Sequence, residues 1–332
     1  MFVEFGIGQT AQGVDLNNSS GVTLRHAYGW WDVNPNFTIM AGKSTTPFSP
    51  LMPSQMMGTN SGSYNVIGLG YGEFYSGRFA QVRGTFKMGK IGRIELALVD
   101  PNSGQRYADT AAQEYQNFFP INDYTGEDPL GRLYQNNSKI PAIHLAVPLY
   151  FGPIAVYPGF AYQYRSVDII DPAYSGYDTS LHTYMGSLAV KGGFGPLGFA
   201  VEGNWGQNVG NTRMGLGNSA PTYISSAVIN SVDSKVNDAA TYGYWLDVWY
   251  KIGPVTPHAI FGQLHSDVDW NYEELSAKTT MWGFSIPIDL AKGFRVRPEV
   301  MWYDDGELEY GSSDVQDYGK YALYGVQFQI TF

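Results

Sequence analysis

Apolar and polar side chains alternate with a period of two along most of this chain. Near the C-terminus, residues 324–332 read YGVQFQITF, with aromatic or aliphatic side chains at every second position. Such alternation gives a β-strand one apolar face and one polar face. In several segments of this kind the polar face carries arginine, as at Arg83, Arg93 and Arg297. A soluble barrel would turn its apolar set inward, so this pattern favours strands whose apolar side meets lipid and whose polar side lines a wet interior.

The alternating segments predict fourteen strands. They lie at approximately 1–10, 21–31, 36–43, 78–88, 91–99, 139–150, 154–166, 180–191, 196–206, 240–251, 255–265, 277–288, 293–303 and 320–332. Most have the roughly 9–11 residues that a tilted strand needs to cross a bilayer, and no stretch approaches the roughly 18 consecutive apolar residues of a membrane helix. The fold class expected is all-β.

The connections between these strands alternate strictly between short and long. The short ones are Gly- or Pro-containing turns or brief polar segments, at 33–35, 89–90, 152–153, 192–195, 253–254 and 290–292; the long ones cover 11–20, 44–77, 100–138, 167–179, 207–239, 266–276 and 304–319. Every long connection therefore lies at one end of the strands, as in bacterial outer-membrane barrels. We predict a single domain over residues 1–332, a transmembrane antiparallel up-and-down β-barrel.

Composition narrows the function further. Charged residues make up 15 % of the chain and the formal net charge is -10, which argues against a nucleic-acid partner. There is no cysteine, and the five histidines show no metal-ligand spacing. No serine or comparable nucleophile is marked by a neighbouring base, so we expect neither an enzyme nor a cofactor. Acidic groups in the long connections are expected to be a solvated surface.

Three segments resemble the trimeric general porins of Gram-negative outer membranes: LRHAY at 24–28, AGKSTTPFSP at 41–50 and the terminal strand that ends in Phe332. The resemblance implies an integral outer-membrane protein in contact with lipid and lipopolysaccharide, assembled as a homotrimer. It also implies a 16-stranded barrel whose third external loop, after the fifth strand, folds into the lumen.

The 44–77 segment matches that constriction loop, yet here it follows the third predicted strand. We therefore expect the full protein to have 16 strands, with an N-terminal hairpin and an export signal that this sequence lacks. A native 14-stranded barrel is the alternative. Tyr and Trp near strand ends are expected to form interfacial girdles: Tyr28, Trp30, Tyr150, Phe151, Trp249 and Tyr250.

The predicted function is passive diffusion of small hydrophilic solutes and ions. A pore needs charges that set the field across it. The candidates on the polar faces or at the loop are Arg25, Lys43, Arg83, Lys87, Arg93, Glu95, Arg165, Arg295, Arg297 and Glu299. Basic groups outnumber acidic ones in this set, which predicts a weak anion preference. Alternatively, the arginines only pair with nearby carboxylates and keep the lumen hydrated.

The 44–77 segment is poor in acid, with Glu73 alone, and contains Met52, Phe48 and Tyr71 among other apolar residues. We expect its Met and aromatic side chains to anchor the loop against the wall. Alternatively, the segment forms a constriction with little negative charge. Two other functions stay open: a substrate-selective uptake channel, which its ligand would block, and a structural or adhesive barrel, which would not conduct.

Overall fold

The computed structural model describes residues 1–7, 22–54, 70–74, 77–101, 125–127, 133–138, 140–169, 178–212, 221, 224–229, 236–270, 273–310 and 314–331. Nineteen strands form one sheet, and β13 (Val228–Ile229) and β14 (Val236–Asn237) form a separate pair. One short 3-10 helix, η2, covers Val209–Asn211. Within these residues, no helix has the length and apolar character needed to cross a membrane. The predicted all-β class is confirmed.

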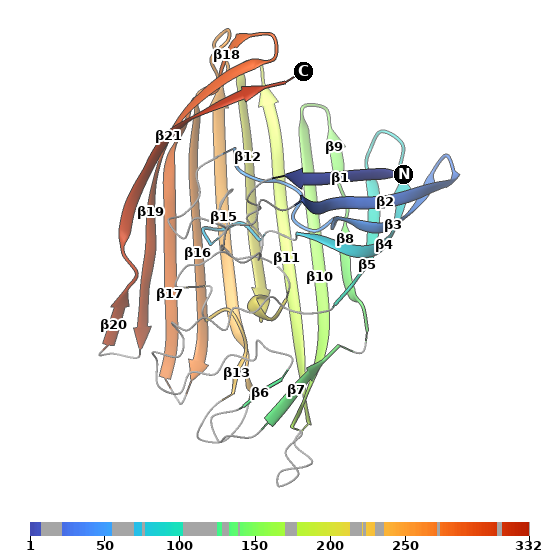
Figure 1. Cartoon of the computed structure of the whole chain (residues 1–332), viewed down its shortest axis with the longest axis vertical. Helices are drawn as coiled ribbons and strands as arrows, with labels where there is room; N and C mark the ends of the chain where they lie inside the picture. Colours follow the sequence, from blue (N-terminus) through green and yellow to red (C-terminus); the bar gives the residue numbers. More distant parts are fainter. Residues whose placement is uncertain are drawn as a thin grey trace.

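Long antiparallel strands follow one another around a curved wall, each paired with the next along the chain (Figure 1). They are β1 (Phe2–Ile7), β2 (Val22–Asn34), β3 (Phe37–Thr45), β4 (Arg78–Lys87), β5 (Arg93–Val99), β8 (Ala142–Ala146) with β9 (Leu149–Phe151), β10 (Ile154–Ile169), β11 (Asp178–Phe194), β12 (Leu197–Gln207), β15 (Ala239–Tyr250), β16 (His258–Trp270), β17 (Glu273–Ser285) with β18 (Ile288–Ala291), β19 (Phe294–Tyr310) and β21 (Lys320–Ile330). Each predicted strand overlaps one of these positions. The short β6 (Thr125–Glu127), β7 (Leu133–Asn137) and β20 (Asp314–Asp317) lie in long connections.

Proline explains why two wall positions are split. Pro148 separates β8 from β9, and Pro287 separates β17 from β18; proline has no N–H to offer the ladder. The pairing nevertheless continues across each break, because the N–H of Val147 bonds to the oxygen of Pro158 at 3.0 Å and that of Ile286 to the oxygen of Pro298 at 2.9 Å. Each pair of short strands therefore acts as one wall strand.

The two borders of the wall are β1 and β21. Among the described residues, β1 pairs with β2 alone and β21 with β19 alone. The predicted up-and-down order is confirmed, whereas the pairing that would close the barrel between the first and last strands is not seen among these residues. Tyr324, on the outer face of β21, is accordingly 83 % exposed.

Glycine builds several of the short turns at one end of the wall. Gly152, Gly195 and Gly253 have φ of 60°, 60° and 56°, in the left-handed region that other residues avoid. The predicted turns at 152–153 and 253–254 are confirmed. The turn predicted at 192–195 is shorter than expected, because β11 continues to Phe194 and only Gly195 and Pro196 remain to link it to β12.

Burial in this fold is inverted relative to a soluble protein. Outward side chains such as Phe328 (69 %), Phe86 (50 %) and Leu188 (49 %) are exposed, although they are large and apolar. On the opposite side of the sheet, Glu202 and Ser266 are fully buried. An exposed apolar surface of this extent is stable only against another apolar medium or partner. The core therefore lies on the concave side, where segments of the long connections cover the polar faces of the strands.

Candidate functional site

The ends of the 44–77 segment lie on the inner side of the wall. Phe48, Tyr71 and Phe74 are completely buried. Phe48 and Phe74 belong to one apolar cluster with residues of the wall and η2: Ala161, Met185, Val209 and Leu264. Phe48 also meets the ring of His144 on β8 edge to face, with the ring centres 6.0 Å apart. Both ends of the segment thus pack against inward-facing side chains of several strands.

Residues 70–74 form a strap along the inner faces of β12, β15 and β17. Asn204 on β12 donates its amide to the oxygen of Gly72 at 2.9 Å, and the hydroxyl of Thr279 on β17 donates to the oxygen of Gly70 at 2.5 Å. Gly72 has φ +111°, and a Cβ there would lie 2.2 Å from the main-chain oxygen of Tyr244 on β15. Only glycine permits so close an approach, so the strap's contact with the wall is built into the sequence.

The hydroxyl of Tyr71 ties the strap to the far border of the wall. It donates to Asp305 Oδ1 on β19, and Tyr321 on β21 donates to the same oxygen at 3.2 Å. Burial raises the pKa of Tyr71, which keeps this hydroxyl protonated as a donor. The strap therefore reaches from β12 to β21.

A carboxyl pair joins the strap to β12. Ser49 Oγ lies 3.1 Å from Glu73 Oε1 and 2.5 Å from Glu202 Oε1. All three side chains are buried, and both carboxyl groups are fully so. Burial, and next the charge of Glu202, raise the pKa of Glu73 well above its ordinary value.

Ser54 is held from two sides on the same inner surface. Its main-chain N–H donates to Asp247 Oδ2 on β15 at 2.9 Å, and its hydroxyl donates to the same atom. Its main-chain oxygen accepts from Arg297 Nη1 on β19 at 2.9 Å. Asp247 Oδ1 in turn lies 2.8 Å from His258 Nδ1 on β16. Arg297, a predicted site residue, is thus both an inner-wall cation and a contact of the loop.

The candidate residues on β4 and β5 lie close together, because these two strands are paired. Glu95 lies between two guanidinium groups, 3.6 Å from Arg83 Nη1 and 3.0 Å from Arg93 Nε. Arg93 also donates to the hydroxyl of Tyr150 at 2.5 Å. Lys87 lies farther along β4, 3.9 Å from Asp32 Oδ1 in a pair that is half exposed. Two arginines sharing one carboxylate leave a positive excess on this wall.

At the start of the chain, Arg25 pairs with Glu4 through Nε at 2.7 Å. Arg25 lies where the β1–β2 register shifts, next to Glu4 and Phe5. Lys43 lies on β3 opposite Ala27 and Ala80, in the alternate set to Gly42, whose neighbour on β4 is the inner-face Gln81. The register therefore places Lys43 on the outward face with Ala41, which corrects its predicted place in the lumen. Arg25 and Lys43 are therefore grouped with β1–β4, away from the loop anchors on β12–β19.

Arg165 on β10 and Glu299 on β19 are both buried, at 6 % exposure each. The guanidinium of Arg165 donates to the side-chain oxygen of Gln163 from Nε at 2.7 Å and Nη2 at 3.0 Å, with the amide oriented to accept. Glu299 lies two positions from Arg297 on β19, close enough for the two opposite charges to attract each other. Both side chains lie on the buried side of the sheet, and their role in the pore stays a prediction.

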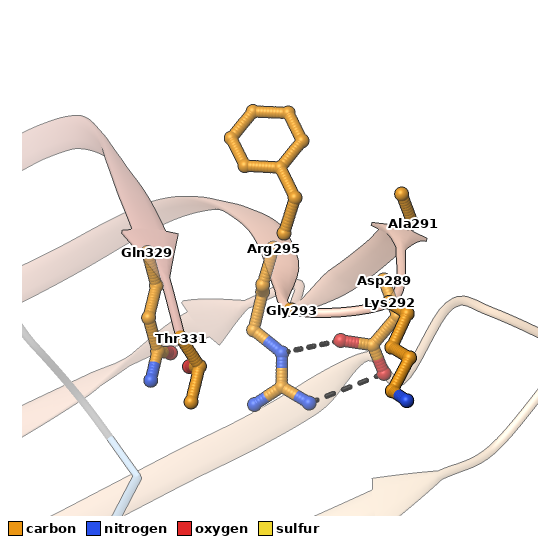
Figure 2. Close-up of a pocket in the computed structure, with 8 residues that line it drawn as sticks. Asp289, Ala291, Lys292, Gly293, Arg295, Gln329 and Thr331 are labelled. Carbon is orange, nitrogen blue, oxygen red and sulfur yellow. Dashed lines mark hydrogen bonds and ion pairs between the residues drawn. The ribbon is translucent and has the colours of Figure 1, made fainter.

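Arg295 lies at the short-turn end, away from the other predicted groups. Figure 2 shows its guanidinium paired with both oxygens of Asp289, at 2.6 and 3.1 Å, beside Lys292 and facing the same space as Gln329 and Thr331. These residues line a pocket of about 660 Å³. The charged groups predicted from sequence thus form separate clusters along the wall rather than one ring.

Several inner-face residues were missed or misplaced by the sequence analysis. Ser49 and Ser54 carried no signal, because their partners are distant in sequence. Trp249 was expected in an interfacial girdle, yet it stacks on His258 at 5.4 Å with Lys191 Nζ 6.0 Å from its ring, on the face that bears Asp247. Trp249 is two positions from Asp247 on β15, so the alternation of side chains already predicts that both lie on the same face. The girdle prediction is also corrected for Tyr28. Tyr28 lies opposite Gly42 on β3, and Gly42 lies opposite the inner-face Gln81 on β4.

Phe151 and Tyr250 are exposed at the short-turn end. Trp30 lies opposite Met40, whose neighbour on β4 is the inner-wall Arg83, and Tyr150 accepts from Arg93, so the girdle prediction is corrected for both. Met56, Met57 and Tyr64, which are further apolar residues of the 44–77 segment, and the terminal Phe332 lie outside the described residues. Among the residues that the structure covers, no group of three or more His, Asp or Glu side chains is placed to hold a metal ion.

Comparison with solved structures identifies the fold. The outer-membrane channel DcaP of Acinetobacter baumannii superposes with a TM-score of 0.61 over 98 % of this chain and 79 % of its own, at 12 % identity. OmpT of Vibrio cholerae, expressed in the outer membrane, superposes with a TM-score of 0.54 over 93 % of this chain and 81 % of its own, at 11 % identity. No protein-family model matches the sequence, and no curated protein is detectably similar to it. At this identity the likeness establishes the fold, and the expected porin-type architecture is confirmed at that level.

Proposed function

We propose that this chain, which shares its fold with outer-membrane channels, is a passive diffusion pore for small hydrophilic solutes and ions, integral to the bacterial outer membrane. The observation that carries the proposal is the inverted wall, apolar and exposed outside, charged and polar inside. Phe86 and Leu96 face outward on the same two strands whose inner faces carry Arg83 and Glu95. A lipid-facing exterior around a polar lumen is what such a pore requires.

The 44–77 segment is proposed to be the constriction. Its two ends pack on the inner wall through Phe48 and the strap at 70–74, and Ser54 is held by Asp247 and Arg297. A loop fixed on the inner wall at these points narrows the space beside it. Its Met and aromatic residues act as anchors in this proposal, because Phe48 and Tyr71 are buried against the wall.

A weak anion preference is proposed for the pore. Arg83 and Arg93 share Glu95, and Arg297 spends one N–H on a main-chain oxygen, which carries no formal charge. Arg83 and Arg93 therefore do pair with a carboxylate, as the alternative role for the arginines requires. Because the two share a single carboxylate, the inner wall of β4 and β5 keeps an excess of positive charge. Charges aimed into a narrow wet space act on passing ions more strongly than exposed ones.

The partners proposed are membrane lipid, lipopolysaccharide and two further copies of this chain. Outward side chains on β4 and β5, among them Val82, Leu96 and Leu98, are about half exposed. Lipid tails or a neighbouring barrel would both cover such a face, and the homotrimer follows from the porin resemblance.

Single-channel recording of the purified protein in a planar bilayer with a salt gradient tests this proposal. We expect openings in groups of three and a reversal potential displaced toward that of the anion. Reversal on the cation side would remove the anion preference, and saturable block by a solute would favour selective uptake. Silence from demonstrably folded protein would refute the channel and leave a structural barrel.

A further inference from the structure

Ser49 lies between two carboxyl groups, that of Glu73 on the strap and that of Glu202 on the wall. Ser49 Oγ contacts a carboxyl oxygen of Glu73 at 3.1 Å and one of Glu202 at 2.5 Å. A hydroxyl has one hydrogen to donate and can otherwise only accept. If both carboxyl groups were ionised, one contact would join two oxygens with no hydrogen between them. One carboxyl group must therefore be protonated and donate to Ser49.

The surroundings favour this protonation. Glu73 and Glu202 are fully buried, and the second oxygen of each has no hydrogen-bond partner within the described part of the chain. Two buried carboxylates without a balancing cation would repel each other and lack solvation. The carboxyl group of Asp247 on β15 forms hydrogen bonds with Ser54 and His258.

Other groups packed around Glu73 offer little compensation. The indole N–H of Trp245 on β15 favours the charged form of Glu73, but makes no hydrogen bond within 3.5 Å. Asn204 on β12 gives an amide N–H to Gly72. Its amide and the main chain of Leu51 favour the charged form of Glu202, not that of Glu73. The charge of Glu202 is the ionic influence on Glu73 among the described residues, and it raises the pKa of Glu73 further.

We propose that Ser49, Glu73 and Glu202 form a proton latch that fixes two points of the 44–77 loop, residues 49 and 73, against β12. This inference rests on the proposed channel function. Within the latch, Glu73 and Ser49 are positioning residues of the loop, and Glu202 is their anchor on the wall. The latch makes the loop's position depend on pH.

The direction of that dependence follows from linkage. Docking raises the pKa of Glu73, so the docked loop binds a proton that the released loop gives up. Docking is therefore fully favoured below the ordinary glutamate value of 4.5 and weakens as the pH rises from there through the raised pKa. Release of Ser49 and Glu73 removes this hold of the loop on the inner wall. Conductance is thus expected to change as the pH rises.

The test is single-channel conductance of the whole protein between about pH 5 and about pH 9, a range above the ordinary titration of glutamate. The conductance of wild type should change, and substates should appear, toward alkaline pH. Glu73→Gln keeps the shape and an N–H donor for Ser49 but cannot ionise, so it should hold the acid conductance throughout. Glu274→Gln, an exposed outward position on β17, should keep the wild-type pH profile. A flat wild-type profile, or a step that survives in Glu73→Gln, would overturn the latch.

Infrared spectroscopy on wild type gives a readout that needs neither conduction nor a variant. The carbonyl stretch of a protonated carboxylic acid should be present at neutral pH. It should disappear as the pH rises, with the same pH midpoint as the conductance step. Ser49→Ala should shift that midpoint, because the hydroxyl between the two carboxyl groups is gone. Absence of the protonated band at neutral pH refutes the latch even if the protein conducts. A silent but folded protein that shows the band refutes the channel function and leaves the protonated contact standing.

Discussion

Arg297 Nη1 lies 2.9 Å from the main-chain oxygen of Ser54, so one inner-wall cation also supports the loop that would narrow the pore. Asp247 holds the same serine through its N–H and hydroxyl. Field and geometry are therefore coupled at this point: a substitution that changes the charge also changes the position of the loop. The two effects can be separated by choosing variants that alter one and keep the other.

Arg297→Met should shift the reversal potential toward cations and increase open-channel noise, because it removes both the charge and the hydrogen bond. A hydrogen bond from a charged donor is worth roughly 1.5–3 kcal/mol. Arg297→Lys keeps the charge but not the planar donor, so it should keep the reversal potential and still raise the noise. Equal noise in wild type and Arg297→Lys would show that Arg297 does not support the loop.

Glu95→Gln should make the pore more anion-preferring, because Arg83 and Arg93 lose the carboxylate that they share at 3.6 and 3.0 Å. The reversal potential in a salt gradient is the measurement. Lys87→Ala is the matched comparison on the same strand: its pair with Asp32 is half exposed and is worth about 0–1 kcal/mol, so folding stability should hardly change. An unchanged reversal potential in Glu95→Gln would place this patch outside the conducting path.

Gly72→Ala should release the strap. The added Cβ would lie 2.2 Å from the Tyr244 oxygen at a φ of +111°, which the wall cannot relieve without moving. Because the chain has no cysteine, Met52→Cys supplies a unique thiol on the loop. Its reaction with a thiol reagent should accelerate in the Gly72→Ala background. Gly203→Ala, where a Cβ meets nothing within 4 Å, should leave the rate unchanged.

Phe48→Ala should weaken loop docking by about 3–5 kcal/mol, the usual cost of removing a buried phenylalanine. The same thiol reaction measures it. Phe86→Ala removes a ring of equal size from the outer face, where it is 50 % exposed, and should leave the loop in place. Similar thiol rates in both variants would mean that burial of Phe48 does not hold the loop.

The wall could be predicted from the sequence because alternation depends on neighbours in the chain. A period of two places Arg83, Glu95 and Asp247 on inner faces without knowledge of any distant residue. Trp249 is an example of a residue misplaced when alternation was not applied. Its position near a strand end suggested the membrane interface, whereas its spacing of two from Asp247 predicts the inner face, where it lies. The outward set was correct for the same reason at Phe328 and Tyr324.

The anchors of the loop could not be predicted, because nothing local encodes them. Ser49 and Glu202 are 153 positions apart, and Tyr71 and Asp305 are 234 apart. Gly72 has the residue type that such a contact needs, but the loop has many glycines and the sequence does not say which one meets a wall. The apolar cluster formed by Phe48 and Phe74 with Leu264 was equally hidden, since a polar lumen gave no reason to expect it.

The strap at 70–74 also constrains the order of assembly. Its partners Asn204, Thr279 and Asp305 lie 132, 209 and 234 positions later than the loop residues that they hold. Contacts of such sequence separation form late, because a long chain must first be ordered to bring them together. Insertion of the wall and docking of the loop are therefore successive events, and a short-lived assembly intermediate with an intact wall and an undocked loop is the species that proteases would attack first.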